Sequence, residues 1–240
     1  IKHRMKDVVE THFSPGDPDL LHSLAQRMAE SGCRVAAHDI LVTNGCQEAL
    51  SLCLRAVAKP GDTIAIESPA FIGLLQLIEA LGLKALEIPC HPTQGMSVEA
   101  LELALEQWPI KAVAVVSSFS NPSGATLSEE RRQALVELLD QKQVPLIEDD
   151  LFGDLSYDGS VLKPCKYWDH SENVLYCSSI SKTLSPGFRM GWLVPGKYYK
   201  EVEFLKAYTN VSAPMYSQLV VAEFLRTGKY DRHLRHIRTQ

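Results

Sequence analysis

The amino-acid sequence predicts an α/β fold built around a mostly parallel sheet. Short runs rich in β-branched residues alternate with amphipathic stretches of about ten to fifteen residues, which is the pattern of βαβ units. The length of 240 residues corresponds to about 1.6 average domains. The composition, with 45% hydrophobic and 22% charged residues, excludes a disordered tail, a collagen-like fibre or a coiled coil. We therefore expect one packed domain with a sizeable core.

Seven segments have the apolar character of strands. They are residues 40–43, 63–67, 85–88, 112–117, 145–149, 174–178 and 191–194. Before the first strand, Asp17 is placed to cap a helix whose first turn holds Pro18. Apolar residues recur every four positions from Leu20 to Met28, and Gly32 ends this helix.

Further helices fill most of the gaps between the strands. We expect them to begin near Cys46, Ala70, Ser97, Ser128, Gly196 and Ala213. Ser97 and Ser128 have the character of N-caps, because each precedes an apolar-periodic segment with acidic residues in its first turn. No internal repeat or low-complexity linker interrupts this order.

Charge and hydropathy exclude several classes of function. The 24 basic and 29 acidic residues give a formal charge of −5, which repels a phosphate backbone, so we expect no direct nucleic-acid binding by this chain. No apolar run approaches the 18 or so residues of a membrane span, and no secretory signal follows Ile1. We expect a cytoplasmic protein with no membrane contact.

Metal and disulfide sites are not expected either. The six cysteines form no C-x-x-C pair, and most of them lie in apolar stretches where a free thiol behaves as a small hydrophobe. The pair His233 and His236 supplies only two ligands, so a solvated helix face explains these residues better than a metal site.

Polar groups follow the predicted strands at the edge where ligands bind in open α/β sheets. After residues 40–43, Gly45 makes a turn that opens a helix, whose free N–H groups suit a phosphate. Phe71 follows residues 63–67, and Asn121 follows residues 112–117. Taken singly, these residues have ordinary alternatives: a glycine that only makes a turn, a core phenylalanine and a common Asn-Pro turn.

The later strand ends carry charge. Glu148, Asp149 and Asp150 terminate an apolar strand, and because side chains alternate between faces, Asp149 points away from its two neighbours. Helix capping or solvation is the alternative for these acids. Lys182 and Arg189 follow residues 174–178 around a Pro-Gly turn, and a surface lysine is the alternative for Lys182.

The whole set matches the needs of one cofactor. Pyridoxal phosphate requires an amine for its aldehyde, a carboxylate near its pyridine nitrogen, donors for its phosphate, a partner for its phenolic oxygen and a flat group against its ring. Five strand ends deliver a phosphate cup, an aromatic ring, an amide, a carboxylate and a lysine.

With these motifs the chain resembles the large domain of fold-type I pyridoxal-phosphate aminotransferases. The resemblance is carried by Thr-Asn-Gly-Cys-Gln-Glu-Ala-Leu at 43–50, Ile-Glu-Asp-Asp at 147–150, Ser-Ser-Ile-Ser-Lys at 178–182 and Pro-Gly-Phe-Arg-Met-Gly-Trp at 186–192. In pattern it is most similar to the aminotransferase-like domain of MocR-subfamily GntR transcriptional regulators.

The resemblance implies a three-layer sandwich with a mostly parallel seven-stranded sheet. Residues 1–240 would form the large, cofactor-binding domain, with 196–240 leading into the interdomain helix. The small C-terminal domain and any N-terminal DNA-binding domain would lie outside this chain. A homodimer, an amino acid or amine as ligand, and contact with DNA only through another domain are implied as well.

The resemblance also implies roles for individual residues. Lys182 would be the Schiff-base lysine and the base that moves the substrate proton, and Asp149 would stay ionised beside the pyridinium nitrogen. Asn121 would donate to the phenolic oxygen, and Phe71 would stack on the ring. The phosphate would be held at the Gly45 turn by the backbone N–H groups of Cys46 and Gln47, together with Ser179 and Arg189. No metal takes part.

Two departures from the family pattern bear on activity. Phe152 stands where aminotransferases usually carry a tyrosine that donates to the phenolic oxygen, and no tyrosine precedes Tyr157. Each missing hydrogen bond to a charged group is worth about 1.5–3 kcal/mol. We therefore expect a ligand sensor that transaminates poorly, with a stand-alone aminotransferase as the alternative. A nucleotide-binding protein is disfavoured, because the chain contains no G-x-G-x-x-G or P-loop motif.

Overall fold

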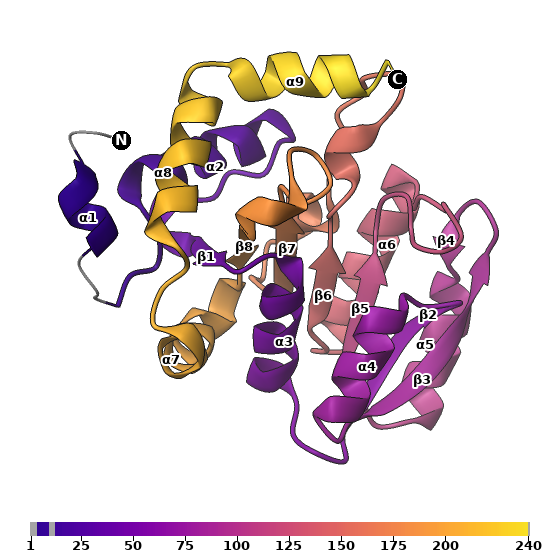
Figure 1. Ribbon diagram of the computed structural model, residues 1–240. Helices are drawn as coiled ribbons and strands as arrows, with labels where there is room; N and C mark the ends of the chain where they lie inside the picture. Colours follow the sequence, from indigo (N-terminus) through magenta and orange to yellow (C-terminus); the bar gives the residue numbers. More distant parts are fainter. Residues whose placement is uncertain (1–3, 10–12, 240) are drawn as a thin grey trace.

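The computed structural model describes residues 4–9 and 13–239, and the described part forms one mixed sheet with helices on both faces (Figure 1). The strand order is β1-β8-β7-β6-β5-β2-β3-β4. The strands are β1 Leu41–Thr43, β2 Thr63–Ser68, β3 Lys84–His91, β4 Gly95–Met96, β5 Ile110–Val116, β6 Leu146–Asp149, β7 Val174–Ser179 and β8 Gly191–Val194. This arrangement confirms the α/β class and the three layers.

The prediction of seven strands was wrong by one, because the sheet of the described residues has eight. All seven predicted strands are present within a few residues of their expected ends. The additional strand, β4, has two residues and pairs with the end of β3, where Cys90 faces Met96. Two residues are too few to show the alternating pattern from which strands are predicted.

Strand direction collects the important loops at one edge of the sheet. The pairs β2–β3, β2–β5, β5–β6 and β6–β7 are parallel. Strand β8 runs antiparallel to both β7 and β1, so β1 points the same way as β7. The loops that follow β1, β2, β5, β6 and β7 therefore meet at the carboxyl edge, and the loop that precedes β8 joins them.

The helices begin where capping chemistry allows. They are α1 Met5–Val9, α2 Pro18–Glu30, α3 Cys46–Val57, α4 Ile72–Ala80, α5 Val98–Gln107, α6 Glu129–Gln141, α7 Tyr199–Asn210, α8 Met215–Arg226 and α9 Lys229–Ile237. The side chain of Asp17 accepts a hydrogen bond from the Leu20 N–H at 3.1 Å, and Ser97 and Ser128 cap α5 and α6 in the same way. These three predicted caps are confirmed.

Other helices differ from the expected ones. Helix α4 begins at Ile72 rather than near Ala70, because Phe71 still has extended backbone angles, and α8 begins at Met215 rather than near Ala213. The segment expected to start near Gly196 opens with the 3₁₀ turn Gly196–Tyr198 before α7 begins. The five-residue α1 was not predicted, since it is too short to show helical periodicity.

Apolar side chains pack on both faces of the sheet. Helices α3, α4 and α7 cover one face, on which the buried Leu52, Ile66 and Leu193 lie in one cluster. The opposite face carries two clusters, one under α2, α8 and α9 and the other under α5 and α6. No helix in residues 4–9 and 13–239 is long and apolar enough to cross a membrane.

Candidate cofactor site

Asp149 ends β6 with its side chain on the α3 side of the sheet. It is 7% exposed and shares its face with Ile147, which packs in the α3 cluster. Glu148 points the other way, where its carboxylate accepts hydrogen bonds from the backbone N–H groups of Cys165 and Lys166 at 2.7 and 3.0 Å. The strand thus separates the neighbouring acids onto opposite faces, as the sequence predicts.

The carboxyl group of Asp149 has one side-chain donor among the described residues, the thiol of Cys46, whose sulfur lies 3.2 Å from Oδ1. Burial raises the pKa of Asp149 to about 6, although this thiol and the Leu151 N–H lower it. None of the ion pairs in residues 4–9 and 13–239 involves Asp149. The carboxylate is therefore suited to receive a cationic N–H group from a ligand.

The N-terminus of α3 forms a cup of hydrogen-bond donors. Gly45 precedes it with φ of 82°, and the described residues offer no acceptor to the backbone N–H groups of Cys46 and Gln47. The Arg189 guanidinium donates to the Asn44 carbonyl at 2.9 Å, so its charge lies at the same turn. This combination of free N–H groups, helix dipole and guanidinium fits a phosphate dianion.

Two glycines make this cup possible. A Cβ atom on Gly45 would lie 2.8 Å from Nη2 of Arg189, and one on Gly191 would lie 2.7 Å from the Gly45 carbonyl carbon. Both contacts are closer than side chains tolerate. Glycine at both positions therefore lets β8, the α3 turn and the Arg189 side chain approach one another.

Lys182 lies on an anchored turn after β7. Its neighbours Ile180 and Thr183 are buried, and the Thr183 hydroxyl oxygen accepts a hydrogen bond from the Tyr230 hydroxyl at 2.6 Å. The buried hydroxyl of Ser179 accepts a hydrogen bond from the Ser181 N–H at 3.1 Å. Lys182 itself is exposed. The turn is held firmly while the ε-amine remains free to reach a ligand at the carboxyl edge.

Phe71 and Asn121 flank the same edge. Phe71 is half-buried at the start of α4 and lines one small cavity together with Asp149. Asn121 is exposed after β5. The structure thus brings three predicted features together: Phe71 and Asp149 line the same cavity, and Asp149 contacts the Cys46 thiol at the N-terminus of α3. No hydrogen bond among the described residues joins Asn121 or Lys182 to them. Phe152, at the start of the 3₁₀ turn Gly153–Leu155, offers no hydroxyl group.

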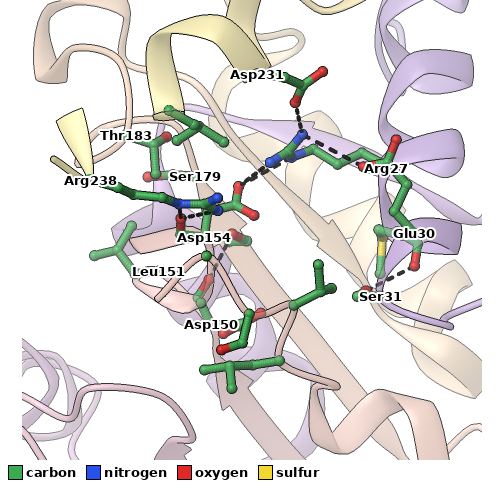
Figure 2. A pocket seen from close by; sticks show the side chains of 18 of the residues that line it. Arg27, Glu30, Ser31, Asp150, Leu151, Asp154, Ser179, Thr183, Asp231 and Arg238 are labelled. Carbon is green, nitrogen blue, oxygen red and sulfur yellow. Dashed lines mark hydrogen bonds and ion pairs between the residues drawn. The ribbon is translucent and has the colours of Figure 1, made fainter. Parts of the chain in front are cut away.

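A pocket of about 410 Å³ lies between α2, α9 and the loop after β6 (Figure 2). Arg27 pairs with Asp154 and Asp231 at 2.9 Å, and Arg238 donates two hydrogen bonds to the Asp154 carbonyl. Of the predicted site residues, only Ser179 lines this pocket. The Arg27 ion pair ties the loop that follows Asp149 to α2, and the hydrogen bonds from Arg238 and from the Tyr230 hydroxyl tie it to the α9 segment.

Sequence reasoning missed two residues that support the site, Glu67 and Arg132, and one side-chain contact of a predicted residue. Cys46 was predicted to act only through its backbone N–H, but its thiol also contacts Asp149. Glu67 accepts hydrogen bonds from the Val116 N–H and the Ser120 hydroxyl. Arg132 is fully buried on α6 and donates to the carbonyl of Ser117, at the start of the loop that carries Asn121. An ionisable residue inside an apolar strand is a signal that would have singled out Glu67.

Comparison with known proteins agrees with this geometry. The family model described as aminotransferase class I and II matches residues 4–238. The HTH-type transcriptional regulators YjiR and YdcR of Escherichia coli are 39% and 41% identical to the chain, over 99% and 95% of it and 51% and 49% of their own lengths. Aromatic-amino-acid aminotransferase 1 of Thermococcus litoralis is 32% identical, over 95% of this chain and 58% of its own.

Solved structures show the same fold. The kynurenine aminotransferase of Pyrococcus horikoshii, crystallised with PMP, superposes with a TM-score of 0.90 and 30% identity over 99% of this chain and 61% of its own. The multiple substrate aminotransferase of Thermococcus profundus also has a TM-score of 0.90, with 28% identity over 98% of this chain and 60% of its own.

These matches confirm the resemblance to the aminotransferase-like domains of transcriptional regulators, and the chain spans about half the length of the curated regulators that it matches. They agree with a donor set that suits a phosphate, a cationic ring nitrogen and an aldehyde. The chain belongs to the aminotransferase class I and II family, and its cofactor is pyridoxal phosphate.

Proposed function

We propose that this chain is the pyridoxal-phosphate-binding, aminotransferase-like effector domain of a MocR-type transcriptional regulator. The observation that carries the proposal is the similarity to two helix-turn-helix regulators over nearly the whole chain but only half of their lengths. The chain would be the large domain, with residues 196–240 leading into the interdomain helix. DNA contact would belong to a separate domain of the whole protein, which would act in the cytoplasm.

The carboxyl edge would bind the two charged ends of the cofactor, its phosphate and its ring nitrogen, with groups of opposite charge. The N–H groups of Cys46 and Gln47, with Ser179 and Arg189, would bind the phosphate. Asp149, whose pKa is about 6 without a ligand, is mostly ionised at pH 7 and would keep the ring nitrogen protonated. When bound, the cofactor supplies an aldehyde that reacts with amines and a ring that withdraws electrons.

The remaining predicted residues would orient the ring and move the proton. Phe71 would lie against the ring face, and Asn121 would donate its amide hydrogen to the phenolic oxygen. Lys182 would provide the amine that fixes the cofactor, and its free amine would then move a proton at the α-carbon of an amino compound. The effector is thus an amino acid or another amine, and the family's fold favours a homodimer with the site near its two-fold axis.

A stand-alone aminotransferase is the second candidate. It is favoured by the 32% identity to the aromatic-amino-acid aminotransferase of Thermococcus litoralis over 95% of this chain. Phe152 favours the regulator, because it cannot donate a hydrogen bond to the phenolic oxygen of the cofactor. Asn121 alone would keep the cofactor bound, but the charge-assisted hydrogen bond that supports turnover would be missing.

Borohydride reduction tests the cofactor site directly. The protein is loaded with pyridoxal phosphate, reduced, digested and mapped by mass spectrometry. We expect a phosphopyridoxyl group on the peptide that contains Lys182, its loss in Lys182→Ala, and its retention in the control Lys197→Ala. An adduct on other lysines only, or none, would refute the site.

Single-turnover measurements with a panel of amino acids then separate the two candidates. A regulator predicts conversion far below the ordinary range of about 1–10³ s⁻¹. Rates within that range would favour the aminotransferase.

A further inference from the structure

Glu67 connects two strand ends beneath the proposed cofactor site. It is the next-to-last residue of β2 and is 5% exposed. Its Oε2 accepts a hydrogen bond from the Val116 backbone N–H at 2.8 Å and another from the Ser120 hydroxyl at 3.2 Å. Val116 is the last residue of β5, the neighbouring parallel strand, and Ser120 lies in the loop that follows it. One carboxylate oxygen therefore joins the last residue of β5 to the loop that follows it.

The positions of these contacts matter because each joined segment leads to a residue that we assign to the cofactor. Ser120 directly precedes Asn121, and Phe71 lies four residues after Glu67. Within the loop after β5, the Ser120 N–H donates to the Ala125 carbonyl at 2.8 Å, while Arg132 of α6 holds the first loop residues, Ser117 and Ser118. The hydroxyl of Ser120 is the group through which Glu67 joins this loop to β2.

The cost of burying Glu67 argues against a purely packing role. Within the described residues no lysine or arginine forms an ion pair with it, and burial raises the pKa of its carboxyl group to about 7. A buried carboxyl group without a cation is unfavourable for folding, and an apolar residue would pack a strand at lower cost. Unlike an apolar residue, Glu67 accepts the two hydrogen bonds from the Val116 N–H and the Ser120 hydroxyl.

We infer that Glu67 is a positioning residue for the cofactor site, which sets Asn121 and Phe71 at the correct separation by binding the β5 end through Val116 and Ser120. The inference rests on the proposed function. It predicts that the loss of the carboxyl oxygen disturbs how the ring is held, while a side chain that keeps an acceptor oxygen restores it.

The test compares four variants of the protein loaded with pyridoxal phosphate. Glu67→Ala removes the acceptor, Glu67→Gln keeps an acceptor oxygen, and Ser120→Ala removes the link to the loop but leaves the Val116 contact. Glu87→Gln is the matched control, because Glu87 is an exposed glutamate on the adjacent strand β3. The readouts are the dissociation constant for pyridoxal phosphate, the circular dichroism of its visible absorption band and the thermal midpoint without cofactor.

We expect Glu67→Ala and Ser120→Ala to weaken cofactor binding about tenfold and to change the visible dichroism, whereas Glu67→Gln and Glu87→Gln stay within about threefold of wild type. If Glu67→Ala does not fold, the cofactor affinity and dichroism of Ser120→Ala and Glu67→Gln still test the positioning role of Glu67. Unchanged affinity and dichroism in Ser120→Ala would overturn the inference, as would an equal loss in Glu67→Gln and Glu67→Ala.

The failure of this inference is distinguishable from failure of the proposed function. If the wild-type protein gives the Lys182 adduct after reduction but the variants bind and orient the cofactor normally, only the role of Glu67 is wrong. If the wild-type protein gives no adduct on Lys182, the proposed site itself is wrong.

Discussion

Replacing Asp149 by asparagine is predicted to stabilise the cofactor-free protein at neutral pH while weakening cofactor binding. Burial raises the pKa of Asp149 from 3.8 to about 6, so the folded state binds this proton more tightly than the unfolded state does. A carboxyl group with a raised folded pKa contributes stability below its unfolded pKa, and that contribution is lost as the pH rises through the folded value. Asparagine resembles the protonated carboxyl group and does not ionise.

The size of the effect follows from the two pKa values. A difference of about two units corresponds to about 3 kcal/mol in total. Between pH 5 and pH 8 about 1.4 kcal/mol of this is lost, because at pH 5 the folded carboxyl group is already protonated to about 90%. The stability of Asp149→Asn relative to wild type should therefore rise by about 1.4 kcal/mol across this interval.

Urea unfolding at pH 5 and pH 8 measures this difference, since the titrations of other groups cancel between the two proteins. With a slope of about 3 kcal/mol per molar urea, the gain appears as a midpoint shift of about 0.5 M at pH 8 relative to pH 5. With saturating pyridoxal phosphate at pH 8, wild type should become more stable than Asp149→Asn. The protonated ring nitrogen would pair with the carboxylate of Asp149 but not with the neutral amide of asparagine. A relative stability that does not change with pH would refute the reasoning.

Three further predictions follow from the geometry of the site. Gly45→Ala should weaken pyridoxal phosphate binding at least about tenfold in a titration, because its φ of 82° disfavours any side chain by about 1–3 kcal/mol and the new Cβ meets Arg189; unchanged affinity would contradict the phosphate cup. Arg132→Met should lower the unfolding free energy in urea by at least about 3 kcal/mol, because it removes the guanidinium that donates to the carbonyl groups of Leu127, Lys163 and Ser117, while Arg131→Met should cost under about 1 kcal/mol. Phe152→Tyr should tighten pyridoxal phosphate binding up to about tenfold through a new hydroxyl donor, and a weaker complex would show that this position does not face the phenolic oxygen.

The strands were predictable from local pattern because each buried run is apolar on its own. All seven predicted strands exist, and β8 has the predicted bounds, Gly191–Val194. Strand β4 and helix α1 were not predictable, because two and five residues carry too little periodicity. Boundaries that depend on backbone geometry, such as the start of α4 after Phe71, also shifted.

The candidate site was predictable as far as it consists of residues that directly follow strands, since topology alone brings such loops to one edge. The supporting contacts were not, because they join residues far apart in the sequence. Cys46 and Asp149 are 103 positions apart, and Glu67 and Ser120 are 53 positions apart. Such contacts depend on which strands become neighbours and on the register between them, which the hydrophobic pattern does not specify.

The distribution of charge explains why the buried acids at the carboxyl edge cost folding free energy. Glu67 and Asp149 are buried at the carboxyl edge without cationic partners in the described residues, and burial raises the pKa of both. The cations of the site, Lys182 and Arg189, are exposed instead. A ligand with a protonated ring nitrogen at one end and a phosphate at the other would compensate Asp149 and Arg189 at once. The folding free energy that the buried carboxyl groups cost would then be recovered when a pyridine phosphate binds. This coupling would serve a sensor as well as an enzyme, because in both cases cofactor binding would favour the folded arrangement of the carboxyl edge.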